Sequence, residues 1–187
     1  MQVWYELNDA SGNNTWQNFL HAGNPTNTWG DGQPFTQYGE EGGVNGQTMG
    51  VDAMFAMATT WDFFQNIFYR NGLDDLGTSI FAEVGLTDSY YRNNAAFDPW
   101  NMGLYLGTGT PDGFGSFTEF GVVAHEMTHG VTASTAKFVN SPGYEEAGLN
   151  EGTSDFFAQM AMAYASAPGA ALPDAGATWT LGEGLGQ

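Results

Sequence analysis

Two histidines and a glutamate in the segment Val122–Gly130 stand at a spacing that suits a metal ion. His125 and His129 are four positions apart, and Glu126 follows the first of them. Side chains four apart lie on one face of a helix, so both imidazoles can reach a single ion. Zinc accepts imidazole nitrogen and carboxylate oxygen, and a catalytic zinc has three protein ligands plus a water molecule. Glu151 is the natural third ligand.

A pair of carboxylates follows downstream. Glu151 and Asp155 are also four apart, so one helix face presents both side chains. Asp155 can accept the Nδ1–H of His125 and thereby fix its tautomer, as partners of metal-bound histidines do. The alternatives are a purely structural role for the two histidines and an ordinary exposed position for Asp155. His21, the third histidine of the chain, stands alone, and we expect it to be a surface or packing residue.

These segments resemble a known family. VVAHEMTHGVT, followed by GLNEGTSDFF, is similar to the active-site helix pair of the thermolysin-like neutral metallopeptidases, zincins whose third zinc ligand is a glutamate. The resemblance spans about residues 45 to 187. Its further matches are Gly50–Ala53, Thr60–Asn66, Asn93–Phe97 and, weakly, Trp179–Glu183.

The resemblance implies a secreted zinc endopeptidase that acts on peptide or protein substrates. One zinc ion would be bound by His125, His129 and Glu151, which lowers the pKa of its water toward ~7. Glu126 would act as the general base, taking the proton of that water and passing it to the leaving amine. We expect burial between a β lobe and the helices to raise the pKa of Glu126. The backbone next to the glutamate ligand, at Asn150, would hold the second histidine.

Substrate binding is expected at Asn94 and Ala95. In the family, the matching segment is a strand edge that holds the substrate backbone through main-chain hydrogen bonds. Here Asn93–Phe97 carries one residue more than the usual pattern. The alternative is an ordinary strand and turn.

Two catalytic groups of the family have no clear match. The tyrosine that stabilises the oxyanion corresponds to Asn140, and Tyr144 is the candidate substitute. A further histidine belongs to a C-terminal helical lobe that this chain does not reach. Because losing an oxyanion donor costs roughly a hundredfold to a thousandfold in rate, a weak enzyme, a trimmed fragment and a naturally minimal form all stay open. The alternative function is a zinc-stabilised binding or scaffold module, but such a module has no need of a carboxylate at Glu126.

The double calcium site of the family is predicted to be absent. Calcium takes six to eight oxygen ligands, often several of them carboxylates. The acidic positions of that site correspond here to Gly121, Met162, Thr178 and Thr180, with only Glu183 retained.

The charge balance is strongly acidic. The 187 residues include 21 Asp and Glu against 3 Lys and Arg, which gives a net charge of −18. Binding to a phosphate backbone or an anionic membrane needs basic side chains, so we expect no nucleic-acid or membrane partner. Self-repulsion of this size is relieved by salt, which favours a saline, halophilic setting over simple drift in composition.

Compartment signals are few. There is no cysteine, which excludes disulfides and thiolate sites, and no apolar run approaches the length of a membrane span. The segment Met1–Glu6 lacks the basic and apolar regions of a signal peptide. The expectation of secretion therefore rests on the resemblance, which implies a signal and a propeptide.

We predict an α+β fold of the zincin type. Residues 1–115 would form an irregular β-rich lobe with one long helix, and residues 116–187 a helical metal-site lobe at the cleft floor, truncated relative to the family. The face left by the missing lobe could drive self-association. Helices are expected at Val51–Asn71, Phe117–Lys137 and Glu151–Ala165, and strands at Val3–Leu7, Ser79–Leu86, Tyr90–Arg92 and Gly103–Leu106.

Overall fold

The computed structural model describes residues 1–8, 14–18, 28–39, 41, 43–138, 145–166, 180–182 and 185. Five residues about which the sequence makes predictions lie outside these ranges: His21, Asn140, Tyr144, Thr178 and Glu183.

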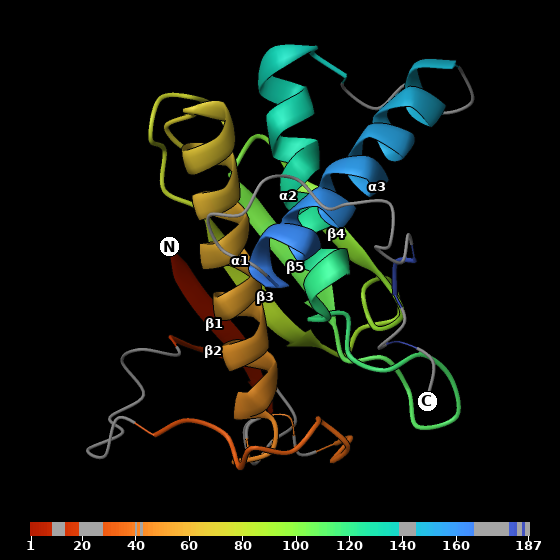
Figure 1. Ribbon diagram of the computed structural model, residues 1–187. Coiled ribbons are helices and arrows are strands. Elements are labelled where there is room, and N and C mark those ends of the chain that lie inside the picture. Colours follow the sequence, from red (N-terminus) through yellow and green to blue (C-terminus); the bar gives the residue numbers. More distant parts are fainter. Residues whose placement is uncertain are drawn as a thin grey trace.

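One mixed sheet stands behind the helices (Figure 1). Its strands lie in the order β2-β1-β3-β5-β4. The central strands β1, β3 and β5 are parallel, whereas β2 and β4 pair antiparallel at the two edges. The strand bounds are β1 Gln2–Asn8, β2 Asn14–Asn18, β3 Phe81–Leu86, β4 Ala95–Asp98 and β5 Gly103–Gly107.

Three helices cover the sheet. They are α1 (Gln47–Phe68), α2 (Phe120–Thr135) and α3 (Glu145–Ser166). α1 packs on β1 and β3, α2 packs on β4 and β5, and α3 packs on the other two helices, most extensively on α2. The predicted α+β fold is therefore confirmed. None of the described helices is long and apolar enough to cross a membrane.

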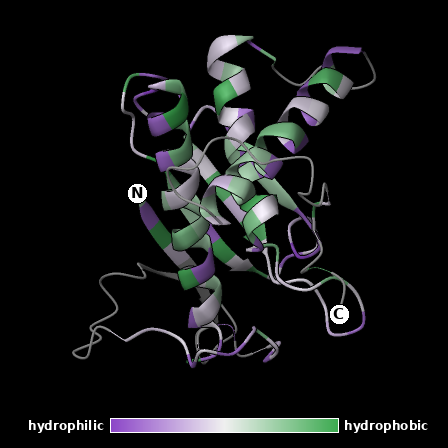
Figure 2. Cartoon of the chain, in the orientation of Figure 1, coloured by the Kyte–Doolittle hydropathy of each residue, from purple (hydrophilic) through white to green (hydrophobic). Residues whose placement is uncertain are grey.

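The core lies between the helices and the sheet. Its α1 side is built from buried residues that recur every three or four positions, as expected for one face of a helix. They include Met49, Ala53, Ala56, Thr60 and Phe63. Figure 2 shows hydrophobic residues in green where α1 and α2 meet the strands, with hydrophilic positions at the helix ends and loops.

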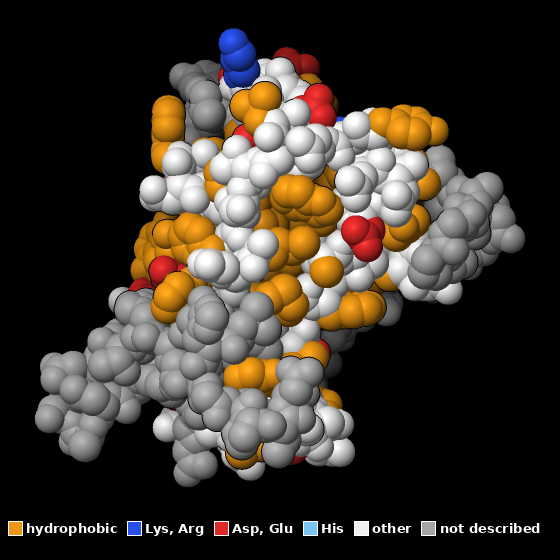
Figure 3. Space-filling view, turned by 90° about the vertical axis from the view of Figure 1, so that its left-hand side faces the viewer, with side chains coloured by type: hydrophobic (Ala, Val, Ile, Leu, Met, Phe, Trp, Pro, Cys, Tyr) orange, Lys and Arg blue, Asp and Glu red, His pale blue; other side chains and the backbone are white. Residues whose placement is uncertain are grey.

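Both ends of α1 differ from the prediction. The helix starts at Gln47, four residues before Val51, so Asp52 lies inside it and not in its first turn. It ends at Phe68, because Tyr69 adopts a left-handed conformation (φ 58°) and its backbone N–H donates to Phe64 O. Figure 3 shows hydrophobic side chains on the flank that carries this helix, where Phe55 is 59% exposed.

The later elements also shift. α2 starts at Phe120 and not at Phe117, because Glu119 is its N-cap and the carboxylate accepts from Val122 N at 3.1 Å. α3 starts at Glu145, six residues before the predicted Glu151. Two acidic residues, Glu145 and Glu146, stand in its first turn, where the helix dipole favours negative charge.

The predicted strand at Tyr90–Arg92 is wrong. These residues form a turn, because the Asp88 carboxylate accepts from Tyr90 N at 2.8 Å and from Tyr91 N at 3.1 Å, and Arg92 N donates to Asp88 O at 2.9 Å. Such an aspartate-capped turn competes with strand pairing.

The close packing of α2 on β4 leaves no room for a side chain at position 130. A methyl group there would lie 2.7 Å from Phe97 Cζ and 2.8 Å from Leu73 Cδ1. Although alanine favours a helix over glycine by about 1 kcal/mol, overpacking costs about 1–3 kcal/mol. We expect Gly130→Ala to lower the free energy of unfolding by about 1–2 kcal/mol in urea denaturation.

Gly148→Ala is the matched control, because a Cβ at Gly148 on α3 would meet nothing within 4 Å. We expect this variant to gain about 0.5–1 kcal/mol from helix propensity alone. A gain of the same size in both variants would show that α2 is not tightly packed at Gly130.

Candidate metal and catalytic site

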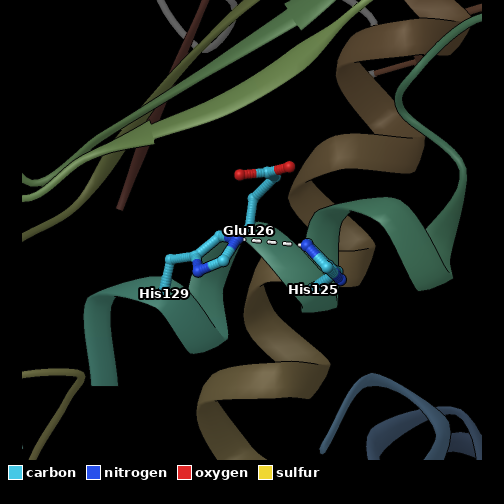
Figure 4. Close-up of side chains that lie close together, drawn as sticks. All are labelled: His125, Glu126 and His129. Atoms are coloured by element: carbon cyan, nitrogen blue, oxygen red, sulfur yellow. Dashed lines mark hydrogen bonds between the residues drawn. The ribbon is translucent and has the colours of Figure 1, made fainter. Parts of the chain in front are cut away.

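His125 and His129 face each other on α2. Their Nε2 atoms are 3.1 Å apart and their ring planes are nearly perpendicular, at 84°. Figure 4 shows both imidazoles projecting from the same helix, with the dashed line joining them. Val123, Met127 and Val131 bury the opposite face of α2 in the core, so the imidazoles are the groups that this helix offers to the cleft.

α3 adds a carboxylate to this pair. Glu151 Oε2 lies 3.2 Å from His125 Nε2, and Glu151 Oε1 lies 3.6 Å from His129 Nε2. Ligand atoms about 2.0–2.1 Å from a tetrahedral zinc ion are roughly 3.3 Å from one another. The distance between the two nitrogens and the distance from each nitrogen to its nearer Glu151 oxygen are therefore close to the spacing of ligand atoms around zinc.

Each imidazole is held by a second contact on its other nitrogen. His125 Nδ1 lies 2.8 Å from Asp155 Oδ1, and His129 Nδ1 lies 3.1 Å from the buried Ser154 Oγ. When each Nδ1–H donates to these oxygens, both Nε2 lone pairs point at the Glu151 carboxylate. In this arrangement the two Nε2 atoms and the Glu151 carboxylate are all acceptors, and no hydrogen atom lies between them. Such a group of lone pairs favours a bound cation.

Ser154 was not found by the sequence analysis, although it stands three residues after Glu151 and on the same helix face. Asn150, which we expected beside His129, is buried, and its Oδ1 accepts from Thr132 Oγ1 at 2.6 Å. Burial lowers the pKa of His129, and the adjacent His125 lowers it further. Both effects favour the neutral imidazole, the form that binds a metal.

Glu126 points away from the imidazoles toward the sheet (Figure 4). Its ligand atom still lies within 4.8 Å of those of His125 and His129. The residue is only 8% exposed. Burial raises its pKa to about 7, against the opposing effects of His125 and of the backbone N–H of Phe97. The sequence predicts a shift in this direction. A pKa near 7 suits a group that exchanges protons near neutral pH.

These side chains line two adjoining cavities of a cleft. One of about 580 Å³ extends toward the end of α2, and one of about 270 Å³ lies near its start. Both cavities contain Asn94, Ala95, His125 and Glu126, so the structure places the predicted substrate-binding positions next to the histidines. Val122 lines the smaller cavity as well.

The chain matches known proteins over much of its length. The model of the family "Thermolysin metallopeptidase, catalytic domain" matches residues 3–133, which include both histidines and Glu126. The transglutaminase-activating metalloprotease of Streptomyces mobaraensis is 33% identical over 174 residues, covering 88% of this chain and 21% of that protein. Neutral protease NprE of Bacillus pumilus is 39% identical over 118 residues, covering 59% of this chain and 35% of that protein.

A solved structure shows the same fold. The precursor of protealysin, a metalloproteinase from Serratia proteamaculans, matches with a TM-score of 0.62 and 24% identity, covering 88% of this chain and 44% of that one. The chain thus spans about one fifth to one third of the two curated relatives and less than half of the solved structure.

The raised pKa of Glu126 predicts a pH effect on the metal-free protein. The folded chain binds this proton more tightly than the unfolded chain, whose glutamate titrates near 4.5. The resulting stabilisation is complete below pH 4.5 and is lost as pH rises through about 7. Relative to wild type, metal-free Glu126→Gln should therefore gain about 3 kcal/mol between those pH values, measured by urea unfolding.

Glu145→Gln, in the exposed first turn of α3, is the control and should show no comparable trend. Parallel stability profiles of wild type and Glu126→Gln from pH 4 to pH 8 would contradict a buried, raised-pKa carboxylate.

Proposed function

Because the chain belongs to the thermolysin metallopeptidase family, which bears out the resemblance in its sequence, we propose that it is a zinc-dependent endopeptidase. The observation that carries this proposal is the close approach of the Glu151 carboxylate to the two imidazoles, beside a buried Glu126. The Nε2 atoms of His125 and His129 are 3.1 Å apart, and Glu151 places Oε2 3.2 Å from the first and Oε1 3.6 Å from the second.

His125, His129 and Glu151 would hold the zinc ion. Their donor set of two imidazoles and one carboxylate fits catalytic zinc and leaves one corner of the tetrahedron for water or substrate. A bound zinc ion would supply an activated water molecule and polarise the scissile carbonyl. Asp155 and Ser154 would orient the two imidazoles through their Nδ1 atoms.

Glu126 would act as general base and then as general acid. With a pKa near 7, its carboxylate can accept a proton from water and later give it to the leaving amine. Its position against the backbone of Phe97 puts it beneath the strand along which a peptide would lie.

The edge strand β4 would bind the substrate backbone. It pairs only with β5 among the described strands, so its other edge is available to an extended peptide. Asn94 and Ala95, which line both cavities, would make these contacts. Asn140 and Tyr144, outside the described ranges, stay candidates for stabilising the oxyanion.

The absence of the calcium pair is a further part of the proposal. It is supported by the surroundings of Gly121, where a Cβ would lie 3.0 Å from Leu181 Cδ2 and from Met162 Sδ, and 3.1 Å from a single carboxylate oxygen, Glu119 Oε2. The backbone oxygen of Thr180 accepts a hydrogen bond from Gln159 Nε2. This environment does not provide the several carboxylates that calcium prefers.

Secretion, a saline setting and self-association are also proposals. A relative from Pectobacterium carotovorum that is 36% identical over 128 residues is named an extracellular metalloprotease. The net charge of −18 supports a protein that works in a saline setting.

Self-association would use the exposed side of α3. Leu149 and Phe156 on this helix are exposed apolar side chains, so a contact through this face would appear as a dimer in sedimentation at high protein concentration.

Hydrolysis tests the main proposal. The zinc-loaded chain should cleave casein or a blocked dipeptide, and Glu126→Gln should lose at least a hundredfold in kcat, the size of contribution expected for proton transfer. The variant should keep one zinc ion by metal analysis, because Glu126 lies outside the proposed ligand set. If the wild type binds zinc and hydrolyses no peptide, the alternative of a zinc-stabilised module is correct.

Asp155→Asn tests how His125 is held. The amide keeps the size of the side chain but removes the charge that orients the imidazole, so zinc affinity should fall about 10–100-fold in competition with a chelator. Asp62→Asn, at an exposed position of α1, is the control. Equal zinc affinity in both variants would show that Asp155 does not support the site.

A further inference from the structure

The larger cavity contains aromatic side chains that the proposed chemistry does not use. Tyr90 and Trp100 line it beyond the histidines, together with Phe138 near the end of α2. Trp100 is 88% exposed and Tyr90 is 69% exposed. Large apolar side chains that are gathered on one exposed surface commonly mark a site that binds another molecule. Two such side chains in one cleft therefore indicate a binding surface.

The backbone N–H of each of these aromatic residues is held by an aspartate two residues before it. Asp88 Oδ1 accepts from Tyr90 N at 2.8 Å, and Asp98 Oδ1 accepts from Trp100 N at 2.8 Å. The second oxygen of Asp98 accepts from Asn101 Nδ2 at 2.6 Å. Each ring is therefore presented on a rigid turn, with a carboxylate next to its backbone.

The electrostatics of this region favour a cation. Burial raises the pKa of Tyr91, and the negative charges of Asp88 and Asp98 raise it further.

None of the described residues that line the cavity is Lys or Arg. The whole chain has only three basic residues, Arg70, Arg92 and Lys137. The Nε of Arg92 donates a hydrogen bond of 2.8 Å to the backbone carbonyl of Thr87.

We propose that this half of the cleft binds a Lys or Arg side chain of the peptide substrate, held against Trp100 and Tyr90. Aromatic faces attract ammonium and guanidinium groups, and tryptophan does so most strongly. An acidic protein also concentrates cationic ligands near its clefts. The inference deepens the proposed endopeptidase function by naming a substrate class for the same site.

Peptides that differ at one position test the preference. A series with Lys, Gln, Glu or Phe placed in turn at each position on both sides of the scissile bond would be hydrolysed by the zinc-loaded chain in 10 mM salt. At one position we expect kcat/KM for Lys to exceed that for Gln by about tenfold, with Glu lowest. Added 1 M NaCl should reduce this ratio, because the Debye length falls to about 3 Å.

Variants of the two aromatic residues assign the preference to this surface. Trp100→Leu and Tyr90→Leu should each lower the Lys-to-Gln ratio by about two- to fivefold, the factor expected for a cation–π contact at an exposed site. Tyr69→Leu is the control, because Tyr69 is 90% exposed on another turn and lines neither cavity of the cleft. It should leave the ratio unchanged.

A binding measurement separates this inference from the proposed function. Zinc-loaded Glu126→Gln would be titrated calorimetrically with the Lys and Gln peptides, alone and combined with Trp100→Leu. Tighter binding of the Lys peptide that depends on Trp100 supports the inference even if the wild type hydrolyses nothing. Two results would overturn the inference and leave the endopeptidase proposal standing. One is hydrolysis with a preference for Phe, and the other is a Lys-to-Gln ratio that Trp100→Leu does not change.

Discussion

The packing of α3 along α2 is the contact on which the site depends. α2 alone presents two imidazoles whose Nε2 atoms are 3.1 Å apart. Only α3 supplies Glu151 on one side of the pair and Asp155 and Ser154 on the other. These polar groups come together because the buried faces of both helices share one core, in which Val123, Met127, Ala158 and Ala161 are inaccessible to solvent.

Local periodicity explains which parts of the site could be predicted. The spacing of the two histidines and the spacing of Glu151 and Asp155 are each set within one helix, so the sequence places these side chains on shared faces. Which helix faces which is a tertiary property, and here the family resemblance supplied it. Ser154 was missed because a serine between two carboxylates carries no signal of its own until its partner on the other helix is known.

The wrong boundaries have a common cause. The start of α3 was placed too late because Gly148 and Asn150 are weak helix formers, whereas packing against α2 carries the helix through them. Tyr90–Arg92 looked like a strand because tyrosines favour strands, but a side-chain bond from Asp88 overrode that preference. Phe55 stands two positions after the buried Ala53 and one before the buried Ala56, so it lies on the outer side of α1, where it packs edge-on against Phe120. In each case a contact distant in sequence, or a side chain bonding the backbone, outweighed local propensity.

The edge strand β4 links the substrate surface to the chemistry. The same strand that offers a free edge to a peptide also covers Glu126, and the backbone N–H of Phe97 lies against its carboxylate. Burial is the largest cause of the raised pKa of Glu126. A peptide added along β4 would exclude more water from this carboxylate and strengthen the same effect, since desolvation disfavours its charged form. The proton affinity of the proposed base therefore depends on the strand proposed to hold the substrate. A change in β4 that loosens its packing on α2 would alter substrate binding and proton transfer together, because the two share one contact surface.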